Sequence, residues 1–353
     1  NLSTFLMFKF DELSRLHLEV SSNCQAKCPL CPRTVKGSTN PNLTISSWNL
    51  SDYQKILPAK VIKQLEYIFF CGNYGDPAMC TDLIDMIAYT TDINPKFSFG
   101  IHTNGSLRTQ SWWKELAITL PEAHKVTFAL DGLSDTHDLY RIGTDFNKII
   151  SNAKAFIGAG GQAEWQFIRF RHNEHQVAEA KQMAKDLGFI NFWMRDSREW
   201  NSHELPVYDG DAITHYLEPA TDVNPRIITS DIIQNLDNIM SNMDIDCAVK
   251  HRKEAFITYD GTVLPCCYLG QIPHLSVPDN VIDQDRTIAK KIDHEYHELI
   301  YSLGGTKNLN ALKNSLDDII NSEQYQTVWD TYWHDKKLIT CAKTCGKQSD
   351  DDK

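Results

Sequence analysis

The chain has 353 residues, 42% of them hydrophobic, which is ordinary for a globular protein with one large domain and a smaller second unit. Its 46 Asp and Glu outnumber its 35 Lys and Arg, and the net charge of −11 excludes an extended nucleic-acid-binding surface, which needs a positive footprint. No stretch is apolar enough to span a membrane and no signal peptide is recognisable, so we expect a cytoplasmic protein.

Runs of β-branched and aromatic residues alternate with helical patterns over the first 200 residues. We predict strands over residues 16–21, 67–71, 97–102, 125–130, 164–170 and 191–195. Helices are expected over residues 80–90, 110–120, 146–158 and 174–187. This alternation predicts an α/β fold whose parallel sheet is covered by helices, and six units indicate a partial (β/α)6 TIM-like barrel. Chemistry in such folds gathers at the carboxyl ends of the strands.

The alternation stops near residue 200. Residues 201–240 are largely polar and carry Pro206, Pro219 and Pro225, which predicts a linker between a core domain (1–200) and a small C-terminal domain (241–353). Within the C-terminal domain, Asp260-Gly261 predicts a hairpin turn, and residues 312–329 are expected to be helical.

Three of the ten cysteines lie in one short loop after the first predicted strand. Cys24, Cys28 and Cys31 have the spacing Cys-x3-Cys-x2-Cys within NCQAKCPLCP. Three thiolates on one loop can hold three corners of a 4Fe–4S cluster and leave one iron open, as a catalytic site requires. A zinc site is the alternative, for which His17 is the only close histidine.

This loop, placed after the first strand of a partial barrel, resembles the defining feature of the radical S-adenosylmethionine (SAM) superfamily. The resemblance implies that SAM chelates the open iron through its amino and carboxylate groups. It also implies that the reduced cluster cleaves SAM to methionine and a 5′-deoxyadenosyl radical, which abstracts hydrogen from a substrate. Leu30 departs from the aromatic residue that many members carry before the third cysteine.

Glycines and polar residues follow the second and third strands. Residues 70–77, FCGNYGDP, resemble the family's Gly-Gly-Glu-Pro element, which implies that Gly72, Asn73, Gly75 and Asp76 contact the SAM amino group, with Asp76 in the Glu position. A plain strand-to-turn junction is the alternative. Thr103 and Asn104 resemble the element that meets the SAM ribose, although Asn-Gly is also simply a turn signal.

Two further elements follow the fourth and fifth strands. Residues 129–132, ALDG, resemble the family's Ser-x-Asp-Gly with alanine in place of serine, and the downstream Arg141 corresponds to the arginine near the SAM carboxylate. A surface helix arginine is the alternative. The resemblance also places His172 and Asn173 near SAM, against the adenine, although a lone histidine is more often structural.

A second set of cysteines lies in the C-terminal domain. Cys247, Gly261 and Cys266 have the spacing Cys-x13-Gly-x4-Cys, which matches the start of the SPASM and twitch extensions of radical SAM enzymes. With Cys341 and Cys345 the resemblance implies one auxiliary 4Fe–4S cluster with four thiolate ligands, the twitch form, since the further cysteine run of a full SPASM domain is absent. Cys267 could replace Cys266, and zinc is an alternative; Cys71 and Cys80 are expected to be free thiols.

The resemblance therefore implies a radical SAM enzyme with two clusters. Relatives with this extension mainly modify peptides or proteins, so a peptide or protein side chain is the expected substrate. A twitch-type dehydrogenase of a small-molecule alcohol and a non-catalytic metal-binding protein are the alternatives. A flavodoxin- or ferredoxin-type electron donor is the expected partner.

Overall fold

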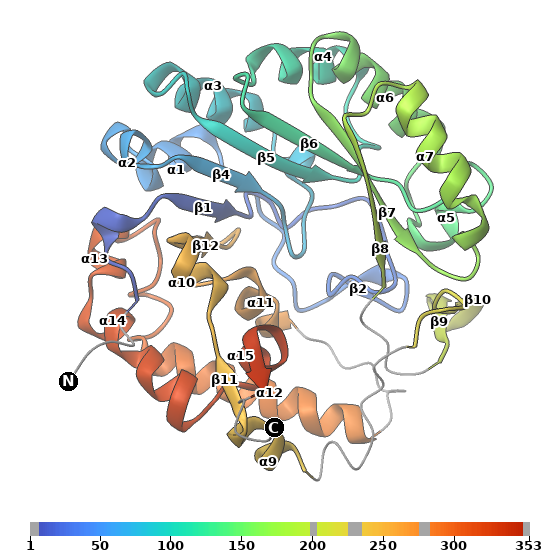
Figure 1. The fold of residues 1–353 in the computed structure, drawn as a ribbon. Coiled ribbons are helices and arrows are strands. Elements are labelled where there is room, and N and C mark those ends of the chain that lie inside the picture. Colours follow the sequence, from blue (N-terminus) through green and yellow to red (C-terminus); the bar gives the residue numbers. More distant parts are fainter. Residues whose placement is uncertain (1–6, 198–202, 225–234, 275–282, 349–353) are drawn as a thin grey trace. The chain divides into compact units, whose positions relative to one another are not determined.

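The computed structural model describes residues 7–197, 203–224, 235–274 and 283–348 (Figure 1). The chain forms two compact units, one of Leu18–Ile227 and one that joins Asn1–His17 to Ile228–Lys353. This division falls inside the predicted linker, of which residues 201–202 and 225–234 lie outside the described residues. None of the described helices is long and apolar enough to cross a membrane.

The unit of Leu18–Ile227 is built on a parallel sheet. Its strands pair in chain order: β4 (Tyr67–Phe70), β5 (Ser98–Thr103), β6 (His124–Ala129), β7 (Ala163–Arg169) and β8 (Asn191–Asp196). The carboxyl end of β1 (Arg15–Leu18) lies beside the carboxyl end of β4, where Cys71 N donates to Leu18 O over 3.2 Å. Six successive strands and parallel pairing confirm the predicted partial α/β barrel.

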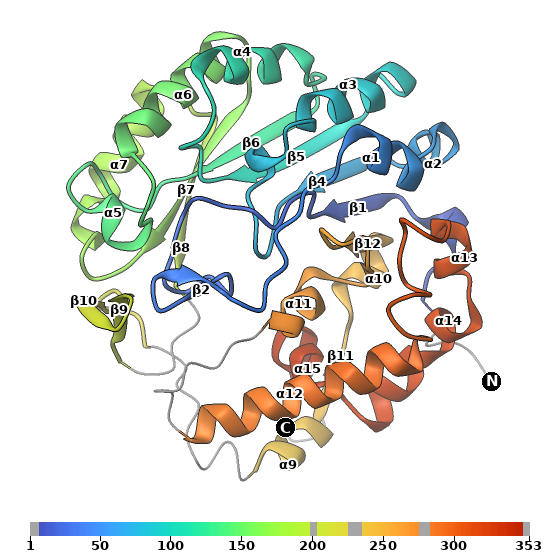
Figure 2. The ribbon, with the colours of Figure 1, turned by 180° about the vertical axis from the view of Figure 1, so that it is seen from behind.

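Helices cover the outer face of this sheet, as both views show (Figures 1 and 2). They are α1 (Leu50–Ile56), α2 (Ala59–Gln64), α3 (Leu83–Ile93), α4 (Gln110–Thr119), α5 (His137–Tyr140), α6 (Phe146–Gly158) and α7 (Val177–Asp186), with 3-10 turns at η2 (Pro77–Met79) and η3 (Glu174–Gln176). Side-chain caps begin α4 and α6, where Thr109 and Asp145 accept from backbone N–H groups. Between helices and sheet, Trp113 packs on Phe128 with ring centroids 5.0 Å apart, and both are fully buried.

Part of the predicted linker is an ordered hairpin. Strands β9 (Leu205–Asp209) and β10 (Ala212–Leu217) pair in antiparallel fashion around a turn at Gly210. Val207 and Leu217 are buried in one apolar cluster with Cys28 and other residues of the cysteine loop. A second small hairpin, β2 (Thr34–Val35) and β3 (Ser38–Thr39), follows that loop directly.

The unit of Asn1–His17 and Ile228–Lys353 contains the predicted hairpin. Strands β12 (Glu254–Ile257) and β13 (Val263–Leu264) pair in antiparallel fashion, and Gly261 adopts φ +87° in the turn. The predicted helix over 312–329 begins only at Leu316, and it is divided because Ser322 caps a new helix. The remaining elements are η1 (Phe10–Glu12), α9 (Leu236–Ser241), β11 (Met243–Ile245), α10 (Ala248–Arg252), α11 (Cys267–Gly270), η4 (Ile272–His274), α12 (Asp283–Ser302), α13 (Leu316–Ile320), α14 (Glu323–Asp330), η5 (Thr331–Asp335), α15 (Ile339–Cys345) and β14 (Gly346–Gln348).

Candidate functional site

The cysteine loop between β1 and β2 is held by its own backbone. Cys31 N donates to Cys28 O over 3.0 Å, which closes a turn, and Lys27 N donates to Ile142 O over 2.8 Å. Cys28 is 6% exposed, while Cys24 and Cys31 are partly exposed. The loop therefore presents three thiols from a fixed backbone.

The three thiols are close enough to affect one another's ionisation. Burial raises the pKa of Cys24, Cys28 and Cys31, that of Cys31 to about 12, and the charge on Cys28 raises the pKa of the other two further. Buried thiols with raised pKa values need a positive partner to become thiolates, and a metal centre supplies one. Across the described residues, no group of three or more His, Cys, Asp or Glu is placed to hold a single metal ion.

Asp76, Thr103 and Asn104 form a hydrogen-bonded network beside Cys24. Asp76 Oδ1 accepts from Thr103 Oγ1 at 2.9 Å and from Ala78 N at 2.9 Å, and Asp76 Oδ2 accepts from Asn104 N and Nδ2, both at 2.7 Å. The Nδ2 of Asn104 also lies 3.5 Å from Cys24 Sγ. The Asp76 carboxylate thus joins the loop that follows β4 to the loop that follows β5, and Asn104 of the latter lies against the cysteine loop. Whether Asp76, Thr103 and Asn104 also contact SAM stays a prediction.

The loop of Gly72, Asn73 and Gly75 is shaped by a buried carboxylate. Glu19 Oε1 accepts from Tyr74 N at 2.7 Å and from Gly75 N at 3.3 Å. A Cβ on Gly75 would lie 1.8 Å from Ser21 O, so only glycine fits at this position without a shift of the backbone. Our sequence interpretation missed Glu19, although a charged residue within the predicted first strand, between Leu18 and Val20, was an available signal.

Arg141 is a largely buried partner of the fully buried Asp131. Its Nε donates to Asp131 Oδ2 over 2.6 Å, and its Nη1 lies 3.8 Å from Cys28 Sγ. Burial raises the pKa of Asp131, and the Arg141 charge opposes that rise. The arginine side chain is 15% exposed, so the alternative of a surface helix arginine is wrong. Its cation instead faces the cysteine loop, and a contact with the SAM carboxylate stays a prediction.

His172 and Asn173 occupy different environments. Asn173 is fully buried, and its Nδ2 donates to Asp131 O and Ile168 O, so it joins the ends of β6 and β7. The His172 ring stacks on Phe170 with centroids 5.3 Å apart, and burial lowers its pKa to about 4. Among the described residues neither ring nitrogen of His172 has a hydrogen-bond partner. Asn173 therefore braces the ends of these strands, and a contact of His172 or Asn173 with SAM stays a prediction.

The four predicted auxiliary cysteines come together in the C-terminal unit. Cys247 and Cys266 precede α10 and α11, and Cys341 and Cys345 lie on α15. Burial raises the pKa of Cys341, and the charges of Cys266, Cys247 and Cys345 raise it further. Cys266 is therefore one of this group; its neighbour Cys267 occupies the first residue of α11.

The buried surroundings of these cysteines contain hydrogen-bond donors that fit a sulfur-rich group. Tyr325 is fully buried and Trp333 is 3% exposed. In the described part of the chain, neither the Tyr325 hydroxyl nor the Trp333 Nε1 has a hydrogen-bond partner. Buried polar groups are nearly always paired, and cluster sulfurs accept such bonds.

The remaining two cysteines differ in burial. Cys71 is partly exposed at the end of β4. Cys80 is buried, and its thiol donates to Trp48 O over 3.4 Å. Neither forms a disulfide, and both lie outside the two cysteine groups.

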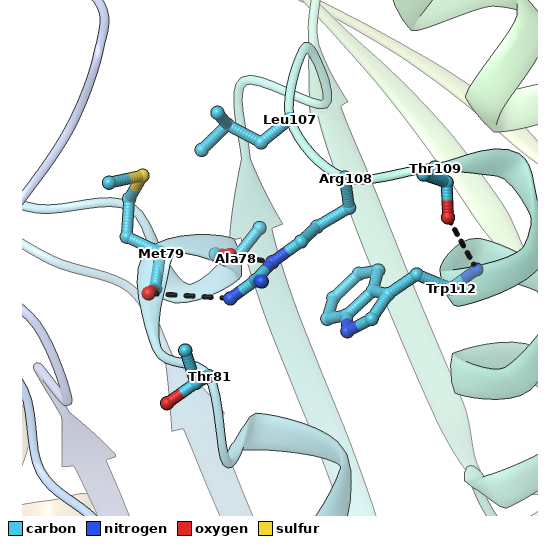
Figure 3. A pocket seen from close by; sticks show the side chains of 7 residues that line it. All are labelled: Ala78, Met79, Thr81, Leu107, Arg108, Thr109 and Trp112. Carbon is cyan, nitrogen blue, oxygen red and sulfur yellow. Dashed lines mark hydrogen bonds between the residues drawn. The ribbon is translucent and has the colours of Figure 1, made fainter.

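A surface pocket of about 510 Å³ lies beside η2 (Figure 3). Arg108 lines it and donates to the backbone oxygens of Ala78 at 2.6 Å and Cys80 at 3.1 Å, with its guanidinium 5.5 Å from the Trp112 ring centroid. Arg108 thereby holds the turn that directly follows Asp76. No residue of this pocket was among the predicted site residues.

Residues 247–346 match the SPASM family, an iron–sulfur cluster-binding domain. A curated relative from Pyrococcus furiosus, the "Tungsten-containing aldehyde ferredoxin oxidoreductase cofactor-modifying protein", is 22% identical over 331 residues, covering 88% of this chain and 81% of that protein.

Two solved structures share the fold. Streptococcus suis SuiB bound to S-adenosylmethionine is 15% identical, with a TM-score of 0.51 over 92% of this chain and 66% of SuiB, so this chain spans about two thirds of that protein. The protein anSMEcpe with bound S-adenosylmethionine is 14% identical, with a TM-score of 0.51 over 88% of this chain and 81% of its own. The resemblance drawn from the sequence is thereby confirmed for the barrel fold and for the cluster-binding C-terminal domain.

Proposed function

We propose that this chain, which has the radical SAM fold and a SPASM iron–sulfur cluster-binding domain, cleaves SAM reductively and abstracts hydrogen from a peptide or protein side chain. The observation that carries this proposal is the group of three thiols on one loop after β1, which a hydrogen bond from Cys31 N to Cys28 O closes into a turn and in which the charge on Cys28 raises the pKa of the other two. Cys24, Cys28 and Cys31 would hold a 4Fe–4S cluster. SAM bound to that cluster supplies the 5′-deoxyadenosyl radical.

The residues around the loop have roles that fit this chemistry. Asn104 Nδ2 and Arg141 Nη1 approach the sulfurs of Cys24 and Cys28, where they would stabilise negative charge. Val207 and Leu217 are each 1% exposed and pack over the loop, which keeps water away from it. We further propose that Gly72, Asn73, Gly75 and His172 contact SAM.

A peptide substrate is supported by what the structural relatives bind. SuiB has been solved bound to the precursor peptide SuiA, and anSMEcpe with a Kp18Cys peptide. A small-molecule substrate is the second candidate, because the Pyrococcus furiosus relative is named for modifying a cofactor. A flavodoxin- or ferredoxin-type donor in the cytoplasm would reduce the clusters.

The test is anaerobic reconstitution with iron and sulfide, followed by dithionite and SAM. We expect about eight irons per chain, four for each cluster, and formation of 5′-deoxyadenosine detected by liquid chromatography. The combined Cys24→Ala, Cys28→Ala and Cys31→Ala variant should lose the product and retain about four irons. Cys80→Ala, which removes a buried thiol outside both groups, should retain both. A reconstituted chain that forms no 5′-deoxyadenosine would contradict the proposal.

Substrate class is tested by supplying candidates to the active enzyme. Hydrogen abstraction from a peptide should transfer deuterium from a side-chain-deuterated peptide into 5′-deoxyadenosine. Transfer only from a deuterated small molecule would favour the second candidate.

A further inference from the structure

The C-terminal unit buries two hydrogen-bond donors that lack an acceptor. The Tyr325 hydroxyl and the Trp333 Nε1 are each enclosed by protein, and neither has a partner among the residues that the structure describes. Nearly all buried donors in native proteins are paired. Two orphaned donors in one place therefore indicate an acceptor that belongs to the functional protein.

Both donors lie with the auxiliary cysteines. Lys250, three residues after Cys247, has its ammonium 5.6 Å from the Trp333 ring centroid. The Trp329 ring, with centroids 6.1 Å from Tyr325 and 5.5 Å from Trp333, connects the two donors. Burial raises the pKa of the Tyr325 hydroxyl, and the charges of Cys266 and Cys247 raise it further. Burial raises the pKa of the Cys341 thiol, and the nearby Trp333 indole N–H lowers it. The two groups are close but do not form a direct hydrogen bond. The missing acceptor for the two donors therefore lies among the auxiliary cysteines.

Other aromatic donors on the same helical segment, α14 and η5, do have hydrogen-bond partners. Tyr325, Trp329 and Trp333 recur at four-residue spacing over α14 and η5. The middle one, Trp329, donates its N–H to Tyr325 O over 2.7 Å. The adjacent Tyr332 pairs its hydroxyl with Ser302 over 3.1 Å. Among the buried side-chain donors of this described segment, only the two beside the cysteines lack partners.

We propose that Tyr325 Oη–H and Trp333 Nε1–H donate hydrogen bonds to the sulfurs of a 4Fe–4S cluster held by Cys247, Cys266, Cys341 and Cys345, and that these bonds raise its reduction potential. The inference rests on the proposed function, which places a cluster there. Hydrogen bonds to cluster sulfurs stabilise the more negative, reduced form, and a low-dielectric interior strengthens them. The Lys250 ammonium, 5.6 Å from the Trp333 ring centroid, adds positive charge that acts on Cys247.

Matched substitutions isolate the two donors. Tyr325→Phe removes only a hydroxyl, and Trp333→Phe removes the indole N–H. Tyr332→Phe and Trp329→Phe make the same changes at donors that already have protein acceptors. All four are made in full-length chains that also carry Cys24→Ala, Cys28→Ala and Cys31→Ala, so that the auxiliary cluster alone contributes the signal.

The measurement is a redox titration followed by electron paramagnetic resonance. At one fixed potential we expect the reduced-to-oxidised ratio to fall about tenfold when both donors are removed, which is about 59 mV for one electron. Each control should leave the ratio within about twofold of the parent. An unchanged ratio in Tyr325→Phe and Trp333→Phe chains with full iron content would overturn the inference.

A second measurement needs no substitution. Resonance Raman bands of the auxiliary Fe–S cluster should shift when the unsubstituted holoenzyme is exchanged into D₂O, and the absence of any shift would also overturn the inference. Failure of the proposed function is recognised separately, by missing 5′-deoxyadenosine in the unsubstituted enzyme. The two failures are therefore distinguishable.

Discussion

Arg141 and Asp131 form an ion pair in which the Arg141 Nε lies 2.6 Å from Asp131 Oδ2 and the Asp131 side chain is fully buried. Asp131→Ala would leave the guanidinium buried without its counter-charge. We expect this to lower the free energy of unfolding by about 3–5 kcal/mol, measured by urea denaturation. Glu218→Ala, which breaks the exposed pair with Arg171, should cost about 0–1 kcal/mol. Similar losses in the two variants would refute a special role for the buried pair.

Glu19 supports the loop after β4 through one carboxylate oxygen. Glu19→Leu would orphan the N–H groups of Tyr74 and Gly75, each costing about 1–3 kcal/mol, and SAM affinity should fall with the loop's order. Glu19→Gln keeps the accepting oxygen and should retain most of both properties. Thermal unfolding and equilibrium dialysis of SAM measure them. Equal behaviour of the leucine and glutamine variants would show that the hydrogen bonds are unimportant.

Gly75 is predicted to reject even a methyl group. A Cβ there would lie 1.8 Å from Ser21 O, so Gly75→Ala forces a backbone shift, and we expect a loss of more than about 2 kcal/mol of stability together with SAM binding. Gly158→Ala is the matched control. A Cβ at Gly158, the last residue of α6, meets nothing within 4 Å, so this change should be neutral or stabilise by up to about 1 kcal/mol. Differential scanning calorimetry of the two variants measures this difference in stability, and equal unfolding temperatures would contradict the prediction.

His124 should make stability depend on pH. Its Nδ1 donates to Pro121 O and its Nε2 accepts from Gln162 N, an arrangement that requires the neutral ring, and burial lowers its pKa. Because the unfolded chain binds the proton more readily, stability is full above the ordinary histidine pKa and falls as pH drops below about 6.5. The slope is at most about 1.4 kcal/mol per pH unit, the limit for one proton.

The check is urea denaturation between pH 7.5 and 5.5. His124→Gln should remove part of the pH dependence, whereas His175→Gln, at an exposed position, should leave it unchanged. Identical pH profiles for His124→Gln and the parent chain would disprove the assignment.

The strands and the cysteine loop were predictable because each leaves a local signature. Alternation of strand-like and helix-like runs marks the barrel, and Asp260-Gly261 marks the hairpin of the C-terminal unit. The β9–β10 hairpin was not predicted, because Pro206 and polar neighbours suggest a linker and its apolar contacts with Ala26 and Cys28 are distant in sequence. The break at Ser322 was hidden by continuous helical periodicity.

The predicted site residues are only partly explained by their motifs. A motif places Asp76 in a loop, but it does not reveal that Thr103 and Asn104 use up its carboxylate oxygens. Tyr325 and Trp333 gave no signal, since aromatic residues at helical spacing ordinarily belong to a core. What distinguishes them is an unmet hydrogen bond, and that is visible only in three dimensions.

The β9–β10 hairpin determines where this chain can be shortened. A fragment that ended at residue 200, the predicted edge of the core, would strip Val207 and Leu217 from the cysteine loop and expose Cys28. One that continued through Asp222 would keep this cover and the Arg169–Asp222 ion pair, at 2.9 Å, that ties it down. The smallest piece that keeps both, and so can protect an oxygen-sensitive centre, therefore extends to Asp222, 26 residues past the end of β8 at Asp196.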